Sequence, residues 1–170
     1  MCVLRHHRTL QVLSAAIPRV VRNNQPRVPF DPAYTLPMDA YDELYAYTMG
    51  RKNFILQHVV DAHKAQTAIA KNPSSIGVIF SLAGLYLHVE KGFTGTQVQN
   101  AHKVMGKVKR SWPDVIWPNE RGDMTAATVL AIPVGQARDD GIDEWCRQVW
   151  SAFSANRGMV ASLVSEYKIA

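Results

Sequence analysis

The sequence predicts an all-α protein, a bundle of four or five main helices around one central apolar helix. The central segment, residues 75–92 (SIGVIFSLAGLYLHVEKG), is apolar on nearly every side, which is typical of a helix enclosed by other elements. The segments on either side repeat apolar residues at intervals of three and four, the spacing of one helix face. No stretch shows the alternation of a half-buried strand over any length.

Two helices are expected before the central one. The first covers 39–49, with Leu44 on its apolar face and Gly50 as the residue that closes it. The second covers about 53–70 and has an apolar line through Val59 on one side. On this helix we expect His63 to point away from the core, into solvent.

The run from Ile76 to Val89 is too long for a typical buried strand and too short to span a bilayer, so it predicts a core helix. Ser74 and Ser75 can cap its start, and Gly92 can end it. Its small residues on one side allow a neighbouring helix to come close. His88 shares that side and is therefore expected to lie against the neighbour.

A fourth helix is expected from Thr94 or Thr96 to about Trp112, where Pro113 stops it. Beyond it, two tryptophans each precede a proline, which favours extended backbone, so we expect a long loop packed onto the bundle. A short helix follows from Thr125 to about 131. The last helix is expected at about 139–167, bent or broken near Gly158, with its acids near its start.

The net charge of +5 does not indicate a nucleic-acid-binding protein. The first 30 residues contain five arginines and no acid, and the rest of the chain carries equal numbers of acidic and basic side chains. Without a net basic field there is little electrostatic attraction for a polyanion. We therefore expect no nucleic-acid partner and no membrane partner. The candidate partners are a small molecule, another protein, or a second copy of the chain in a homo-oligomer.

The chain divides into a basic extension at 1–36 and a single helical domain at 37–170. We expect the extension to be disordered, and a mitochondrial targeting peptide or an over-long translated start are the alternatives. Two cysteines, Cys2 and Cys146, cannot make a disulfide framework, so we expect a cytoplasmic protein. Cys146 lies on an apolar helix line and is interpreted as a core thiol rather than a nucleophile.

Four residues are costly to bury and yet face inward by helical spacing: His58, Asp61, His88 and His102. They come from three helices, and helical bundles build metal sites from side chains on facing helices. Imidazoles and a carboxylate suit zinc, iron or manganese. The first hypothesis is therefore a metal-binding protein, such as a metal-dependent hydrolase, with these four residues at the metal.

Two other interpretations of the same four residues stay open. A buried aspartate and histidine can transfer protons without a metal. Histidines in an apolar stripe can also be structural, each held by hydrogen bonds in the core. The alternative function is then a non-catalytic helical module that binds another protein or a small molecule.

The sequence resembles an uncharacterised bacterial family, known only as a domain of unknown function, from about Tyr41 to Leu163. The likeness rests on YDELYAYT, QHVVDAHKAQ, GLYLHVEKGFTGTQVQNAH, the Trp112-Pro113 pair, ERGDMTAATVLA and IDEWCRQVWSAF. It implies a cytoplasmic, helical, bacterial protein and brings no established activity.

Within these segments the family's pattern matches this chain at His58, Asp61, Gln66, His88 and His102. Many members also carry a histidine near the place of Asn156 and Arg157. A site that needs that ring is therefore altered in this chain.

Overall fold

The computed structural model describes residues 39–69, 76–107 and 111–169. These residues form helices and no strand, which confirms the all-α prediction. The expectations for residues 1–36 and for capping by Ser74 and Ser75 lie outside the described residues. The elements are α1 (Ala40–Met49), η1 (Lys52–Phe54), α2 (Leu56–Thr67), α3 (Ile76–Lys91), α4 (Gly95–Gly106), α5 (Ala126–Leu130), α6 (Gln136–Ala152), η2 (Ser154–Asn156) and α7 (Arg157–Glu166).

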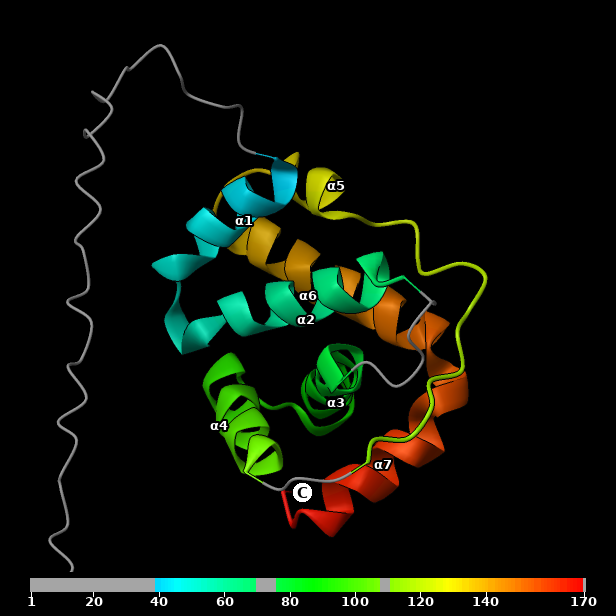
Figure 1. Cartoon of the computed structure of the whole chain (residues 1–170). Coiled ribbons are helices and arrows are strands. Elements are labelled where there is room, and N and C mark those ends of the chain that lie inside the picture. Colours follow the sequence, from blue (N-terminus) through cyan, green and yellow to red (C-terminus); the bar gives the residue numbers. More distant parts are fainter. Residues whose placement is uncertain (1–38, 70–75, 108–110, 170) are drawn as a thin grey trace, which may run out of the picture. The chain divides into compact units, whose positions relative to one another are not determined.

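The central helix is α3, as the sequence predicts. It contacts α2, α4, α6 and α7, and Figure 1 shows it among these helices. On the other side of α2 and α6, α1 packs with α5. Along α3 nearly every residue from Val78 to Leu87 is buried, because neighbours cover all its faces. Among the described residues, no helix is long and apolar enough to cross a membrane.

The caps predicted at Thr94 and Thr125 and the helix end predicted at Gly92 are present, and the first helix has a further cap. Asp39 accepts a hydrogen bond from the backbone of α1, and Thr94 and Thr125 form capping boxes at the starts of α4 and α5. Gly92 has a φ of +68° and ends α3. The Phe93 amide then donates to the Leu87 carbonyl, which turns the chain back over the helix end.

The second helix begins later than expected, at Leu56 rather than near residue 53. Asn53 and Phe54 have φ values of 60° and 55°, which are incompatible with an α-helix. The Phe54 carbonyl packs against Gly95, where a Cβ would lie 1.9 Å from that oxygen. The tight turn is therefore held by close contact with the start of α4.

Two helix ends differ from the prediction. The fourth helix ends at Gly106, and Trp112 lies beyond it, in contact with the Phe80 ring at 5.2 Å between centroids. The last helix is broken at residues 153–156 rather than near Gly158. The break is held by Asn156, whose side chain bonds the backbone N–H and C=O of Ile116 and the Phe153 carbonyl.

The loop 111–125 is packed onto the bundle, as predicted. Near its end, the Gln66 amide donates to the Met124 carbonyl at 2.7 Å and accepts from the Trp145 indole at 3.0 Å. Arg121 donates to the carbonyls of Gln66 and Ala68, at the end of α2. Its guanidinium also lies over the Trp117 ring.

Candidate functional site

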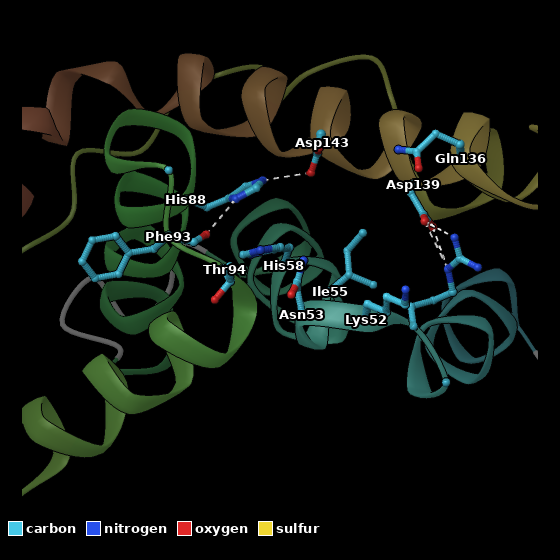
Figure 2. A pocket seen from close by; sticks show the side chains of 13 residues that line it. Lys52, Asn53, Ile55, His58, His88, Phe93, Thr94, Gln136, Asp139 and Asp143 are labelled. Atoms are coloured by element: carbon cyan, nitrogen blue, oxygen red, sulfur yellow. Dashed lines mark hydrogen bonds and ion pairs between the residues drawn. The ribbon is translucent and has the colours of Figure 1, made fainter.

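A pocket of about 720 Å³ lies where several helix ends meet (Figure 2). The amino-terminal ends of α2, α4 and α6 contribute Ile55, Thr94 and Gln136 to its wall. The carboxyl-terminal end of α3 contributes His88. The pocket wall therefore combines side chains from four helices with the strained turn at Asn53.

His88 lies between two hydrogen-bond acceptors. Its Nδ1 is 3.2 Å from the Phe93 carbonyl oxygen, and its Nε2 is 3.0 Å from Oδ1 of Asp143 on α6. Both hydrogen bonds form together when the ring carries two protons and Asp143 is ionised.

The His58 ring stacks on the His88 ring, with centroids 3.6 Å apart. His58 is 4% exposed, and its Nδ1 is buried with no hydrogen-bond partner. Burial and the neighbouring His88 lower its pKa to about 3, and only Asp143 opposes this. The stack is therefore a neutral imidazole against a ring that can carry charge.

Asp143 is the acidic partner of this stack. Burial raises the pKa of its carboxyl, but the hydrogen bond and charge of His88, together with the charges of His58 and Arg147, lower it by more, so the net pKa falls below its usual value. Asp143 is therefore ionised at neutral pH. Three side chains are therefore in contact in sequence: the buried His58 ring stacks on His88, and His88 is hydrogen-bonded to Asp143 on α6.

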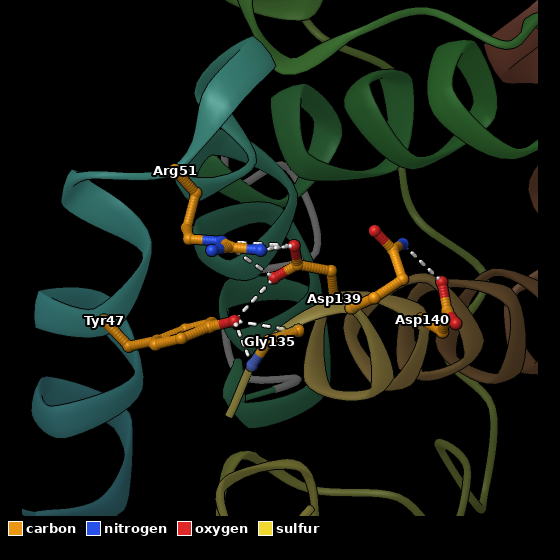
Figure 3. A network of polar contacts seen from close by, with 6 residues as sticks. Tyr47, Arg51, Gly135, Asp139 and Asp140 are labelled. Carbon is orange, nitrogen blue, oxygen red and sulfur yellow. Dashed lines mark hydrogen bonds and ion pairs between the residues drawn. The ribbon is translucent and has the colours of Figure 1, made fainter. Parts of the chain in front are cut away.

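A second charged pair forms another part of the pocket wall (Figure 3). The Arg51 guanidinium makes a salt bridge to Asp139 at the start of α6. The Tyr47 hydroxyl donates to Asp139 Oδ1 at 2.8 Å, and burial and this carboxylate raise the pKa of Tyr47. The pair joins the end of α1 to α6 and fixes this wall.

Asp61 and His102 form a separate buried cluster with Gln57. The Gln57 amide donates to Asp61 Oδ1 at 3.1 Å and lies 3.4 Å from His102 Nδ1. His102 Nε2 donates to the Phe80 carbonyl at 2.9 Å. A Cβ on Gly84 would lie 2.0 Å from Asp61 Oδ2 and 3.1 Å from His102 Nε2, so both side chains pack against this glycine.

The cluster holds its ionisable groups in neutral form. Asp61 is 2% exposed and its Oδ2 has no partner, and burial raises the pKa of the carboxyl well above its usual value despite the Gln57 hydrogen bond. Burial also lowers the pKa of His102, against the effect of its Phe80 hydrogen bond. Neither residue lines the pocket.

The four residues that we predicted as metal ligands are thus divided between two clusters. His58 and His88 are in contact at the pocket, whereas Asp61 and His102 both pack against Gly84 of α3. Within the described residues, no three His, Cys, Asp or Glu side chains are grouped so that they could hold a metal ion. Metal binding by these four residues stays a prediction.

The structure tests two further predictions, one for Cys146 and one for His63. Cys146 is a buried core thiol, as predicted; its Sγ lies 3.6 Å from the His58 carbonyl, and burial raises its pKa well above the usual value. The expectation for His63 is wrong. Its ring is half-buried and stacks on Tyr41 at 3.8 Å, because α1 crosses α2 at that point.

Sequence reasoning missed Asp143 and Asp139 as site residues. We interpreted them as acids that favour a helix start, although they lie three and seven residues before the buried Cys146. That spacing puts them on the same side of α6 as the core line. The spacing therefore indicates the side of α6 from which Asp139 and Asp143 project, but it does not indicate which histidine Asp143 contacts.

A family model with the description "Family of unknown function (DUF5946)" matches residues 38–154. The chain belongs to this family. The matched region includes every residue that lines the pocket and both buried clusters. No curated protein and no solved structure matches the chain.

Asn156 and Arg157 lie beyond the region 38–154 that the family model matches. Asn156 holds the loop through Ile116, and Arg157 pairs with Glu90. Neither residue lines the pocket.

Proposed function

We propose that the chain binds a small polar molecule in the pocket and that His88 transfers a proton to it. The observation that carries the proposal is His88 itself, held between the Phe93 carbonyl and the Asp143 carboxylate at the pocket wall. A positioned imidazole with a carboxylate partner is a common proton donor and acceptor in enzymes. The proposed reaction class is general acid–base catalysis.

The parts of the site have different roles in this proposal. The His88 Nε2 proton is shared with Asp143, so it passes to the bound molecule through the Asp143 carboxyl, which lines the pocket, and the ring recovers a proton from solvent. Asp143 stabilises the charged ring, and the Phe93 carbonyl fixes its orientation. His58 is neutral, so it supports the His88 ring without adding a like charge.

A ligand screen by NMR with ¹⁵N-labelled histidine tests the proposal. Hits from a library of small polar compounds should shift the ring nitrogens of His58 and His88, and His88→Gln should lose these hits. A matched control is His63→Gln, because His63 lies outside the pocket lining. Hits that bind without moving either pocket ring would overturn the proposal.

A second candidate function is metal binding at a changed set of ligands, His88, Asp143 and His58. One observation favours it: His88 donates through Nδ1 to a backbone carbonyl, which is how metal-ligating histidines are commonly oriented. The 3.0 Å between His88 Nε2 and Asp143 Oδ1 also suits two ligands that each lie about 2.1 Å from one ion. The His58 ring would have to turn to join them. The bound metal would supply an activated water, as in a hydrolase.

Calorimetric titration of the untagged chain with zinc, iron(II) and manganese separates the two candidates. Metal binding predicts a stoichiometric ion that Asp143→Asn removes and His102→Gln keeps. Saturation at about 100 times the Kd would stabilise the fold by about 2.7 kcal/mol. The absence of binding for all three ions would exclude this second candidate and leave the acid–base proposal in place.

A further inference from the structure

We propose that the pocket binds its small molecule through an oxyanion, a carboxylate or phosphate group, held at the amino-terminal end of α2 beside Lys52. This inference rests on the proposed function, since it names the class of molecule that the same pocket takes. Four features support it: the helix ends, the buried His58 ring, the balance of charges and the shape of the η1 turn.

The amino-terminal ends of three helices meet at the pocket. Residues from the start of α2, α4 and α6 line it, and these helices contain 12, 12 and 17 residues. The first turn of a helix has backbone N–H groups without partners in the helix and a partial positive charge. The α4 end is closed by its own Thr94 and Gln97 side chains, whereas α2 and α6 both begin with no side-chain cap. The first turn of α6 carries Asp139, and the first turn of α2 carries no acid, so the end that suits an anion is that of α2.

His58 is an independent indication that a ligand belongs at this end. It is the third residue of α2 and lines the pocket, and yet it is 4% exposed and its Nδ1 has no hydrogen-bond partner. Figure 2 shows the ring between Thr94 and Ile55. A buried polar atom without a partner is uncommon in native proteins. The hydrogen-bonding capacity of this ring is not used by the described residues, so a ligand can use it.

The charges of the pocket wall leave one cation unmatched. Arg51 is paired with Asp139, and His88 is paired with Asp143. Lys52 also lines the pocket, and no acidic side chain in the described part of the chain pairs with it. With the two carboxylates already paired, an added anion meets Lys52 and the helix end.

The turn that presents Lys52 is itself unusual. The following residues, Asn53 and Phe54, both have positive φ, a backbone conformation that costs about 1–3 kcal/mol for residues other than glycine. The next residue, Ile55, has φ −55° and ψ −20°. A left-handed residue followed by a right-handed one points successive N–H groups into one hollow, and such hollows bind anions.

The test uses four small probes: acetate, inorganic phosphate, methylammonium as a cation, and acetamide as the neutral match of acetate. Backbone amide shifts are followed by NMR at constant ionic strength set with chloride. Acetate or phosphate should shift the amides of Ile55, Leu56 and Gln57, whereas acetamide and methylammonium should not. Comparison of the two anions decides between a carboxylate and a phosphate ligand.

Two substitutions at Lys52 make the test specific. Lys52→Gln should weaken binding of the preferred anion by about tenfold, the loss expected for one charge-assisted hydrogen bond, and Lys52→Glu should weaken it further. Lys64→Gln is the control, because Lys64 is exposed on α2 and does not line the pocket. The inference is overturned if acetamide binds as well as acetate, or if Lys52→Gln binds the anion as the parent does.

The outcomes also separate this inference from the proposed function. The oxyanion inference would be wrong, and the proton-transfer proposal would remain, if neutral library compounds shift the His88 ring nitrogens while neither anion shifts the Ile55 amide. If no compound of any charge shifts the pocket residues, both fail.

Discussion

His58 and His88 are stacked at 3.6 Å, but their ring nitrogens meet different surroundings. His88 has an acceptor at each nitrogen, and His58 has a buried Nδ1 with none. The same contact therefore joins a ring suited to a positive charge and a ring that resists one. This asymmetry has measurable consequences for stability as well as for chemistry.

The pH dependence of stability should report on His58. Its pKa is about 3 in the folded chain and near 6.5 in the unfolded chain. Between these values the unfolded chain binds a proton that the folded chain does not, so the free energy of unfolding falls as pH falls from about 6.5 to about 3. The slope from one such group approaches about 1.4 kcal/mol per pH unit.

Urea unfolding at a series of pH values measures this slope. His58→Gln should flatten it below about pH 6.5 and leave the pH dependence above about pH 7.5 unchanged. Equal slopes in the parent and the variant at acidic pH would show that the His58 ring is protonated in the fold.

Asp61 should change the free energy of unfolding with pH in the opposite direction to His58. Burial raises its pKa, so the folded chain keeps a proton that the unfolded chain loses as pH rises above about 3.8. Asp61 therefore lowers the free energy of unfolding at neutral pH. Asp61→Asn, of the same shape and always neutral, should increase that free energy by about 1 kcal/mol or more near pH 7, with less gain near pH 4.

Asp42→Asn is the control for this experiment. Asp42 is exposed on α1, and the change should stay within about 0.5 kcal/mol. A loss of stability in Asp61→Asn at neutral pH that disappears at acidic pH would mean that the core needs the Asp61 charge.

Gly84 is required by the close packing of Asp61 and His102 against α3. Gly84→Ala should lower the free energy of unfolding by about 1–3 kcal/mol, because its Cβ would overlap Asp61 Oδ2. Gly158→Ala is the matched control: Gly158 is in α7 with nothing within 4 Å of the added Cβ, and alanine there should stabilise by about 0.5–1 kcal/mol. Thermal unfolding by circular dichroism compares the two. Equal effects would show that Asp61 moves aside freely.

At the scale of helices, the sequence predicted the central helix and most of the caps. Apolar periodicity and the residues Thr94, Thr125 and Gly92 are local signals, and local contacts decide them. The break between α6 and α7 was misplaced because it depends on Asn156 meeting Ile116, 40 residues away. A single-sequence pattern does not contain such a contact.

Gln66 is the side chain on which the packed loop most depends. Gln66→Ala should lower the free energy of unfolding by about 1–3 kcal/mol, because the Trp145 indole N–H and the Met124 carbonyl both lose their partner. It should also make the loop 111–125 more sensitive to limited proteolysis. Gln99→Ala, at a half-buried position of α4 where the side chain accepts from Lys103, should change neither property. An unchanged rate of cleavage in Gln66→Ala would show that other contacts hold the loop.

At the scale of the whole molecule, the sequence predicted that three histidines and Asp61 face the interior, but it did not predict which of them are in contact with one another. Helical phase gives the side from which a residue projects, and the neighbour on that side is decided by how the helices cross. His58 and His88 meet because α2 and α3 pack along their length, and α6 then brings Asp143 to the same place. Asp61 and His102 are separated from them by one turn of α2.

The division of the chain near residue 36 stays a prediction with a direct test. The buried core runs from Leu44 to Val164, so residues 37–170 alone should unfold in one cooperative transition with the Tm of the full chain. Circular dichroism melts of both forms compare them. A Tm lower by more than about 5 °C in the shorter form would show that residues 1–36 contribute to the fold.

The loop 111–125 links the part of the chain that contains α1 to α4 with the part that contains α5 to α7. Its early residue Ile116 is held by Asn156 from the later part, and Met124, near its end, is held by Gln66 from the earlier part as well as by Gln148. The early part of the loop is therefore bound by the later half of the chain, and the end of the loop is bound by the earlier half. The two parts also pack directly on each other, through α2 and α3 against α6 and through α1 against α5. A single backbone cut in the loop should therefore leave two fragments that stay associated.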